Sequence, residues 1–134
     1  MTTKNSISIA RVYDKIAMAD GARLLSDRLW PRGIAKKDLN FDDWIKKAAP
    51  SYELRKWFGH DPKRWTEFRK YYRAELNDNS EAIESCLTWR RKSAVTLLYT
   101  AKNEVHNLAI VLRDYLHKKL KGGKIKQPFA AQGV

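Results

Sequence analysis

One run of the chain restricts the fold more than any other: residues 94–101, AVTLLYTA, are apolar almost without interruption. A strand with one side in water alternates polar and apolar residues, so an unbroken apolar run is typical of a strand covered on both faces. Residues 6–13, SISIARVY, predict another strand, because isoleucine and other bulky residues dominate them. Leu24 and Leu25 predict a short strand that ends at Asp27, after a turn at residues 18–22.

The segment after these strands contains loop and helix signals. Residues 30–33, WPRG, predict a loop because proline and glycine interrupt regular structure. We then expect Asp42 or Asp43 to begin a short helix that passes Ile45 and ends at Pro50.

Two further helix starts follow Pro50. Ser51 is a favourable N-cap, and Gly59 is expected to end the helix that Ser51 begins. Asp61 followed by Pro62 repeats the N-terminal signal and predicts a longer helix up to a loop at residues 77–80.

The C-terminal part is predicted to contain one more helix before residues 94–101 and a final amphipathic helix after them. The apolar positions of the final helix are Leu108, Val111, Leu112, Tyr115 and Leu116. Gly122–Gly123 is expected to close this helix. The basic tail from about residue 121 is expected to be weakly ordered.

Strands separated by helical segments predict a single α/β domain over residues 1–134, with a small, mostly parallel sheet flanked by helices. Ligands of such folds bind beyond the carboxyl ends of the strands. Asp27–Gly33 and Tyr99–Asn103 each follow a strand, so we expect these two loops to face a common crevice.

Composition narrows the class of protein. No apolar run approaches the roughly 20 residues that span a bilayer, residues 1–10 lack the apolar core of a signal peptide, and the single cysteine, Cys86, forms no internal disulfide. A cytoplasmic location is therefore expected, without a membrane partner. The net charge of +12 suits binding of phosphate groups or of nucleic acid, and it equally suits simple solubility.

Four motifs resemble the DUF488 family of uncharacterised bacterial proteins, specifically its short YeaO-like branch. They are RVYD (11–14), SDRLWPRG (26–33), APSYELRKWFGHDPKRW (49–65) and LLYTAKNEVHNLAIVL (97–112). In another branch of this family, the resemblance implies cysteines and histidines around the last strand. Tyr99 and Asn107 stand here where thiols would be expected, and His106 alone does not make a metal site, so no metal or cofactor is expected.

The first candidate site lies on the loop that begins at Asp27. Arg28 and Arg32 are expected to bind a phosphate or carboxylate through paired guanidinium hydrogen bonds, with Trp30 between them. In the alternative interpretation, Arg28 pairs with Asp14, Asp27 or Asp61 and only fixes the loop.

The second candidate site is His60, with Asp27 or Asp61 as its acid–base partner, because histidine exchanges a proton near neutral pH. The alternative gives both residues structural roles: Asp61 is the N-cap before Pro62, and His60 ends the preceding helix.

Two further cations complete the candidate anion-binding residues. Arg55, beside Trp57, is predicted to clamp a base or sugar through a cation–π contact, unless Trp57 is simply part of the core. Lys102 ends the last strand and is a weaker candidate. Cys86 is expected to be a small buried side chain.

These residues support two main hypotheses. In the first, the protein binds a phosphorylated small molecule or other anion without chemistry. In the second, it is an enzyme that acts on such an anion with His60 and an aspartate. A third possibility is nucleic-acid binding by a basic surface, and the oligomeric state stays open. The surface consists of Lys63, Arg64, Arg69, Lys70, Arg73 and the lysines of the tail.

Overall fold

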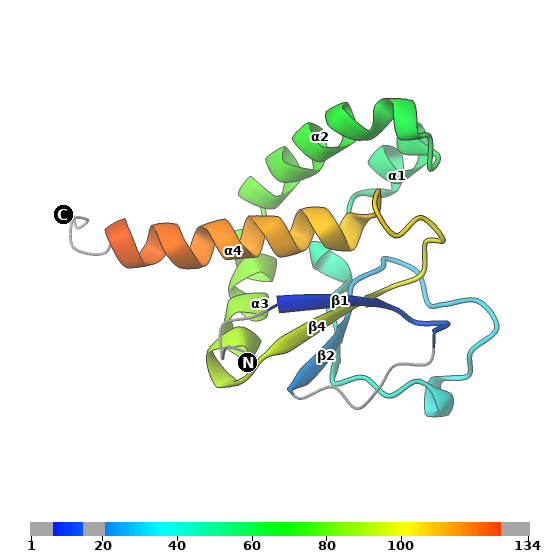
Figure 1. Ribbon diagram of the computed structural model, residues 1–134, viewed down its shortest axis with the longest axis horizontal. Helices are drawn as coiled ribbons and strands as arrows, with labels where there is room; N and C mark the ends of the chain where they lie inside the picture. The colour runs from blue at the N-terminus through cyan, green and yellow to red at the C-terminus, as the bar shows by residue number, and fades with distance from the viewer. Residues whose placement is uncertain (1–6, 15–20, 127–134) are drawn as a thin grey trace.

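The computed structural model describes residues 7–14 and 21–126, with side chains described as far as Lys121. Its centre is a four-stranded parallel sheet in the order β1-β4-β2-β3 (Figure 1). The strands are β1 (Ile7–Arg11), β2 (Ala22–Leu25), β3 (Asp43–Trp44) and β4 (Val95–Tyr99). The prediction of an α/β fold with a small, mostly parallel sheet is confirmed. The turn expected at residues 18–22 lies largely outside the described residues.

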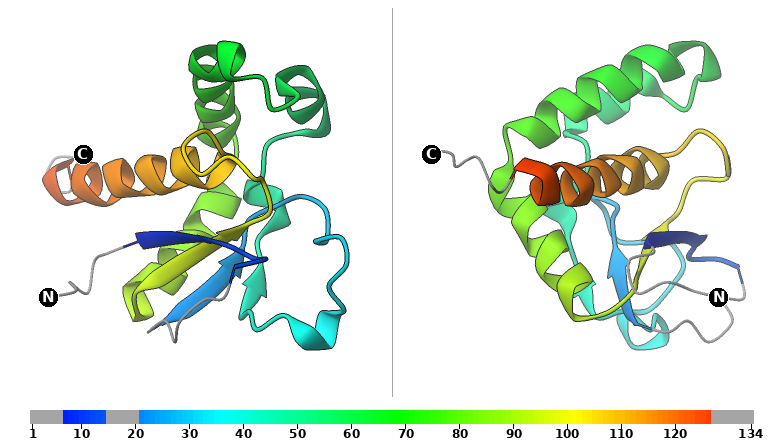
Figure 2. Two further views of the ribbon diagram at one scale, coloured as in Figure 1. Left: turned by 45° about the vertical axis from the view of Figure 1, so that its right-hand side comes forward. Right: turned by 60° about the vertical axis from the view of Figure 1, so that its left-hand side comes forward.

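One face of the sheet is covered by helices. Every second strand residue, such as Leu24 and Leu97, joins the main core with residues of all four α-helices. Figures 1 and 2 show α4 between the sheet and the pair α1–α2, while α3 leads from α2 back to the sheet. These helices are α1 (Tyr52–Phe58), α2 (Trp65–Asn77), α3 (Ser80–Lys92) and α4 (Leu108–Lys126).

The opposite face is covered by the long connection between β2 and β3. Leu25 and Leu98 alternate with the residues of the main core and pack in a second, smaller cluster with Val12. Trp30, Ile34, Leu39, Phe41 and Trp44 lie against this cluster. The connection contains one short 3₁₀ helix, η1 (Lys36–Asp38). The all-buried pattern of β4 follows from this double coverage, as its apolar sequence predicts.

The prediction of a short helix that begins at Asp42 or Asp43 and passes Ile45 is wrong. Asp43 and Trp44 form β3, because the edge of β2 offers backbone partners: Ile45 N donates to Leu25 O at 2.9 Å. The two carboxylates act in tertiary contacts instead of capping a helix, with Asp42 accepting from Arg23 N and Asp43 from the Trp89 indole. Between β3 and Pro50 the chain forms only a 3₁₀ turn, η2 (Lys46–Ala48).

The two helix starts after Pro50 lie where the sequence predicts them. The Ser51 hydroxyl accepts from Leu54 N at 3.1 Å, and Gly59 ends α1 in a left-handed conformation with φ +52°. The Asp61 carboxylate accepts from Lys63 N at 3.0 Å, and Pro62 opens the 3₁₀ turn η3 (Pro62–Arg64) that leads into α2.

The final helix is longer than expected. It continues through Gly122–Gly123 to Lys126, so the prediction that the two glycines close it is wrong. Glycine disfavours a helix interior by only about 1 kcal/mol per residue, which the backbone bonds of a 19-residue helix tolerate. Residues 127–134 lie outside the described part. None of the described helices is both long and apolar enough to cross a membrane.

Candidate functional site

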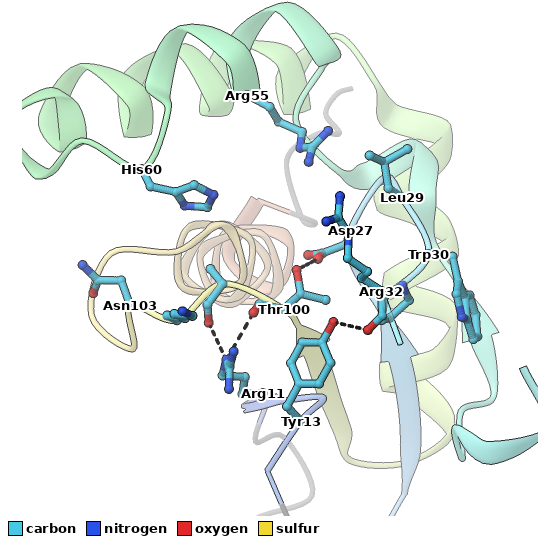
Figure 3. A pocket seen from close by; sticks show the side chains of 13 residues that line it. Arg11, Tyr13, Asp27, Leu29, Trp30, Arg32, Arg55, His60, Thr100 and Asn103 are labelled. Atoms are coloured by element: carbon cyan, nitrogen blue, oxygen red, sulfur yellow. Dashed lines mark hydrogen bonds between the residues drawn. The ribbon is translucent and has the colours of Figure 1, made fainter. Parts of the chain in front are cut away.

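A cavity of about 960 Å³ opens at the carboxyl ends of β1, β2 and β4 (Figure 3). Its lining comes from Arg11 at the end of β1 and Tyr13 after it, residues 27 and 29–32 after β2, residues 100–103 after β4, Arg55 of α1, and His60 of the following turn. The two loops that the sequence predicted to share a crevice therefore do so. The volume lies within the range typical of small-molecule sites.

The cavity lining is strongly cationic. Four of its described residues carry a permanent positive charge, Arg11, Arg32, Arg55 and Lys102, and Asp27 is the single acidic residue among them. Cations gathered around one cavity raise the local concentration of anions. The electrostatics of the site therefore favour an anionic ligand.

Hydrogen bonds between loops fix the floor of the cavity. Arg11 Nε donates to the carbonyls of Thr100 at 3.2 Å and Ala101 at 2.9 Å, which ties the end of β1 to the loop after β4. The Tyr13 hydroxyl donates to the Arg32 carbonyl at 2.7 Å and connects the loop after β1 to the loop after β2. The backbone of Arg32 is thus anchored, while its exposed side chain extends into the cavity (Figure 3).

Arg55 reaches the cavity because it lies at the edge of the face that α1 buries. Leu54 and Phe58 are buried in the main core, so Arg55 lies at the edge of the buried face and is half-buried itself. Figure 3 shows its guanidinium and the His60 ring pointing into the same space.

Asp27 lies at the base of the cavity and is only 8% exposed. Its Oδ2 accepts a hydrogen bond from the Thr100 hydroxyl, and its backbone carbonyl accepts from the Trp44 indole at 2.7 Å. Its Oδ1 is buried without a hydrogen-bond partner among the described residues. Burial raises the pKa of Asp27, although the hydrogen bond from Thr100 and the charge of Arg55 act in the opposite direction.

His60 has an unusual backbone conformation. Its φ of +59° follows the +52° of Gly59, and it is the one non-glycine residue in the described ranges with a positive φ. The turn is closed by Asp61 N, which donates to Phe58 O at 2.9 Å. Strained backbone of this kind is often retained at functional sites.

A smaller inner chamber of about 100 Å³ adjoins the cavity. Asp27, Arg55, His60, Thr100 and Ala101 line both spaces. The rest of the chamber is lined by Pro50, Phe58, Phe68, His106, Asn107 and Leu108. The site thus has a cationic outer part and an inner part between aromatic rings and the start of α4.

Two predicted site residues lie elsewhere. The Arg28 guanidinium donates to the carbonyls of Pro50 at 3.0 Å and Ala49 at 3.3 Å, and it lines a different hollow, beside Ser51 and Glu75. Arg28 therefore fixes the loop, as the alternative interpretation expects, but its partners are backbone carbonyls and not aspartates. Asp61 caps η3 and does not line the cavity.

The tryptophans are mainly structural. Trp30 lines the cavity, but its indole donates to Ile34 O at 2.6 Å and its ring packs edge-on against Phe41 and Trp44. Trp57 packs against the core and lies outside both spaces, so a clamp of Arg55 and Trp57 across a ligand does not form here.

Sequence reasoning missed Arg11 and Tyr13 as lining residues, and it placed Leu29 and Thr100 only as parts of the two loops. A signal was present for Arg11 and Tyr13, because the carboxyl end of β1 lies at the same sheet edge as those of β2 and β4. Leu29, 60% exposed, and Thr100 follow directly from their places in the two loops.

The thiol and imidazole groups do not assemble into a metal site. Within residues 7–14 and 21–126, no group of three or more His, Cys, Asp or Glu side chains is arranged to hold a metal ion. Cys86 is buried in α3, and burial raises the pKa of its thiol to about 12. His106 packs its ring against Trp65, with 4.9 Å between centroids.

Comparison with known proteins gives the family. The chain is 45% identical over 111 residues to the uncharacterised protein YeaO of Escherichia coli (strain K12), covering 83% of this chain and 96% of that protein. It is 38% identical over 117 residues to the uncharacterised proteins Mb3100c of Mycobacterium bovis and Rv3073c of Mycobacterium tuberculosis, with 87% and 98% covered. No solved structure matches significantly. The family model described as "Inactive DUF488-N3 subclade" matches residues 6–131, and the chain therefore belongs to this subclade of the DUF488 proteins.

Proposed function

We propose that the protein binds a small phosphorylated molecule in the cationic cavity and performs no chemistry on it. The observation that carries the proposal is the charge of the lining: Arg11, Arg32, Arg55 and Lys102 surround one space that holds a single carboxyl group, Asp27. Guanidinium groups bind phosphate with paired, charge-assisted hydrogen bonds, which are about twice as strong as neutral ones.

The four cations have different parts in this proposal. Arg32 and Arg55 extend into the space above Asp27 and are the groups that bind the phosphate directly (Figure 3). Arg11 donates its Nε to two carbonyls and has its Nη1 4.0 Å from the Asp14 carboxylate, so it contributes mainly rigidity. Lys102 is exposed on the loop after β4 and attracts the anion to the mouth of the cavity.

The family description supports binding over catalysis, since the matching subclade is described as inactive. One observation favours the alternative of acid–base chemistry: His60 and Asp27 line the same cavity, and burial raises the pKa of Asp27. A carboxyl group with a raised pKa is a suitable proton donor. The two hypotheses differ in whether a bound compound is converted.

The test is a thermal-shift titration with inorganic phosphate, sulfate, sugar phosphates and nucleoside monophosphates. A ligand that binds only the native state at 100 times its Kd stabilises it by about 2.7 kcal/mol, which corresponds to roughly 9 °C in a chain of this length. Arg55→Ala should weaken binding at least about tenfold. Lys56→Ala is the matched control, because it removes one charge from the next residue of α1 outside the cavity.

Three results would change the proposal. Equal losses in Arg55→Ala and Lys56→Ala would mean that net charge, and not the cavity, attracts the anion. Conversion of the bound compound, lost in His60→Ala while binding remains, would favour the enzyme. Binding of an oligonucleotide only, falling steeply with salt, would favour the basic surface of α2.

A further inference from the structure

The inner chamber determines what kind of anion fits. We infer that the ligand is a phosphate monoester whose small apolar group enters the inner chamber while its phosphate stays in the outer cavity. This inference rests on the proposed function, because the phosphate must first bind there. It adds the class of organic group that the same site selects.

The two spaces differ in charge. Arg11, Arg32 and Lys102 line only the outer cavity, and Arg55 stands where the two spaces meet. Asp27 also lies at this junction, with a buried oxygen that no donor reaches within the described part of the chain. A carboxyl group there disfavours entry of a phosphate into the inner chamber. The charges therefore orient the ligand, with its anionic end outward.

Two of the polar side chains that line the inner chamber, Asn107 and Thr100, already have hydrogen-bond partners. The Asn107 side chain donates to Asn103 O at 2.9 Å and accepts from Ile110 N at 3.1 Å, where it caps the start of α4. The Thr100 hydroxyl donates a hydrogen bond to Asp27 Oδ2. A hydroxyl-rich group that entered would therefore gain little from these two side chains in exchange for its water.

Five of the other lining residues are apolar, and the rings of His60 and His106 lie beside them. Phe58 and Phe68 stack with their ring centroids 4.3 Å apart and are 6% and 2% exposed. Pro50, Ala101 and Leu108 complete the apolar part. Burial of an alkyl or small cyclic group against these apolar residues stabilises the complex in proportion to the apolar surface that is buried.

The size of the chamber limits the group. An apolar cavity of about 150 Å³ accommodates benzene, with six carbons. By proportion, the 100 Å³ of the inner chamber accepts about four carbons. Longer chains would extend back into the outer cavity or into solvent and would gain nothing further.

The experiment measures Kd by calorimetry for inorganic phosphate and for methyl, ethyl, propyl, butyl and hexyl phosphate. Affinity should increase up to about fourfold per methylene and stop increasing at about four carbons. Binding should also show an increasingly negative heat-capacity change over the same range. Ala101→Leu should remove the dependence on chain length by filling the junction, with little change for inorganic phosphate. Ala74→Leu, which adds the same atoms on the exposed side of α2, should behave like the wild type.

The outcomes separate the two proposals. If inorganic phosphate binds and affinity does not depend on chain length in the wild type, the inference is wrong while the proposed function stands. Affinity that keeps rising through hexyl phosphate, or an unchanged dependence in Ala101→Leu, would place the alkyl group outside the chamber and also overturn it. If no member of the series binds, both proposals fail. The wild-type series decides the matter even if Ala101→Leu does not fold.

Discussion

Replacing Asp27 by asparagine should stabilise the folded protein at neutral pH. Asp27 is 8% exposed, and its Oδ1 has no hydrogen-bond partner among the described residues. An asparagine oxygen still accepts from the Thr100 hydroxyl, so the substitution keeps the one hydrogen bond of the side chain. It removes the charge that burial disfavours.

The size of the effect follows from two opposing contributions. A buried polar atom without a partner costs about 1–3 kcal/mol, whereas attraction to Arg55 and His60 offsets part of the cost of the ionised carboxylate. The asparagine NH₂ also lacks a partner, although it carries no charge. Because both side chains leave one buried polar atom without a partner, that cost cancels and the gain comes from removal of the charge. We expect it to be on the order of 1 kcal/mol at neutral pH, or roughly 3–4 °C in Tm.

The effect depends on pH in a definite direction. The pKa of Asp27 is raised above its ordinary value of 3.8, so between these two values the folded state binds more protons than the unfolded state. The stability contributed by this group is complete below pH 3.8 and decreases as pH rises through the folded pKa. The advantage of Asp27→Asn should therefore be small at acid pH and should grow toward neutrality.

Urea denaturation followed by tryptophan fluorescence between pH 3.5 and 8 measures this difference. Asp38→Asn, on an exposed side chain, controls for the loss of one negative charge. An Asp27→Asn protein that is less stable than wild type at pH 7 would refute the reasoning. So would an advantage that grows toward acid pH, because the folded state would then favour the ionised carboxylate.

Three further predictions concern particular residues. Gly21→Ala should lower the free energy of unfolding, measured by urea denaturation, by about 3 kcal/mol, because its Cβ would lie 2.1 Å from Ala94 O. Gly33→Ala has open space around it and should cost only the roughly 1 kcal/mol of a positive φ. Equal costs would contradict the steric argument. His60→Gly should be about 1 kcal/mol more stable than His60→Ala, since only glycine adopts φ +59° without strain; equal stability would show that the backbone is unstrained. A thiol reagent should label Cys86 slowly at pH 8 in the native protein and quickly in urea, because burial raises its pKa to about 12; rapid native labelling would mean that α3 opens readily.

The sequence predicted the elements whose signals are local. The continuous apolar run became β4, and Ser51, Gly59 and Asp61 cap their helices as expected. The same rule that places ligands at strand ends predicted the crevice between the loops after β2 and β4. The helix caps and β4 depend on residues near one another in the chain, whereas the crevice follows from the edge that parallel strands share.

The features that were missed depend on partners far away in the chain. Asp43 joins β3 because the backbone of β2 is available at the sheet edge, which no local pattern indicates. Arg28 is drawn from the cavity by the carbonyls of Ala49 and Pro50, more than twenty residues away. Arg11 enters the site because β1 pairs in parallel with β4. A sequence pattern names the groups that are able to bind an anion, but the tertiary fold decides which of them meet.

The central claim is that an oxyanion binds between Arg32 and Arg55 above Asp27. The most direct measurement is a crystal structure with tungstate, whose anomalous scattering locates a tetrahedral oxyanion unambiguously. The account predicts a peak within hydrogen-bond distance of both guanidinium groups, and its loss in Arg55→Ala but not in Lys56→Ala. A cavity without tungstate, while the anion occupies the Arg28 hollow or the surface of α2, would contradict it.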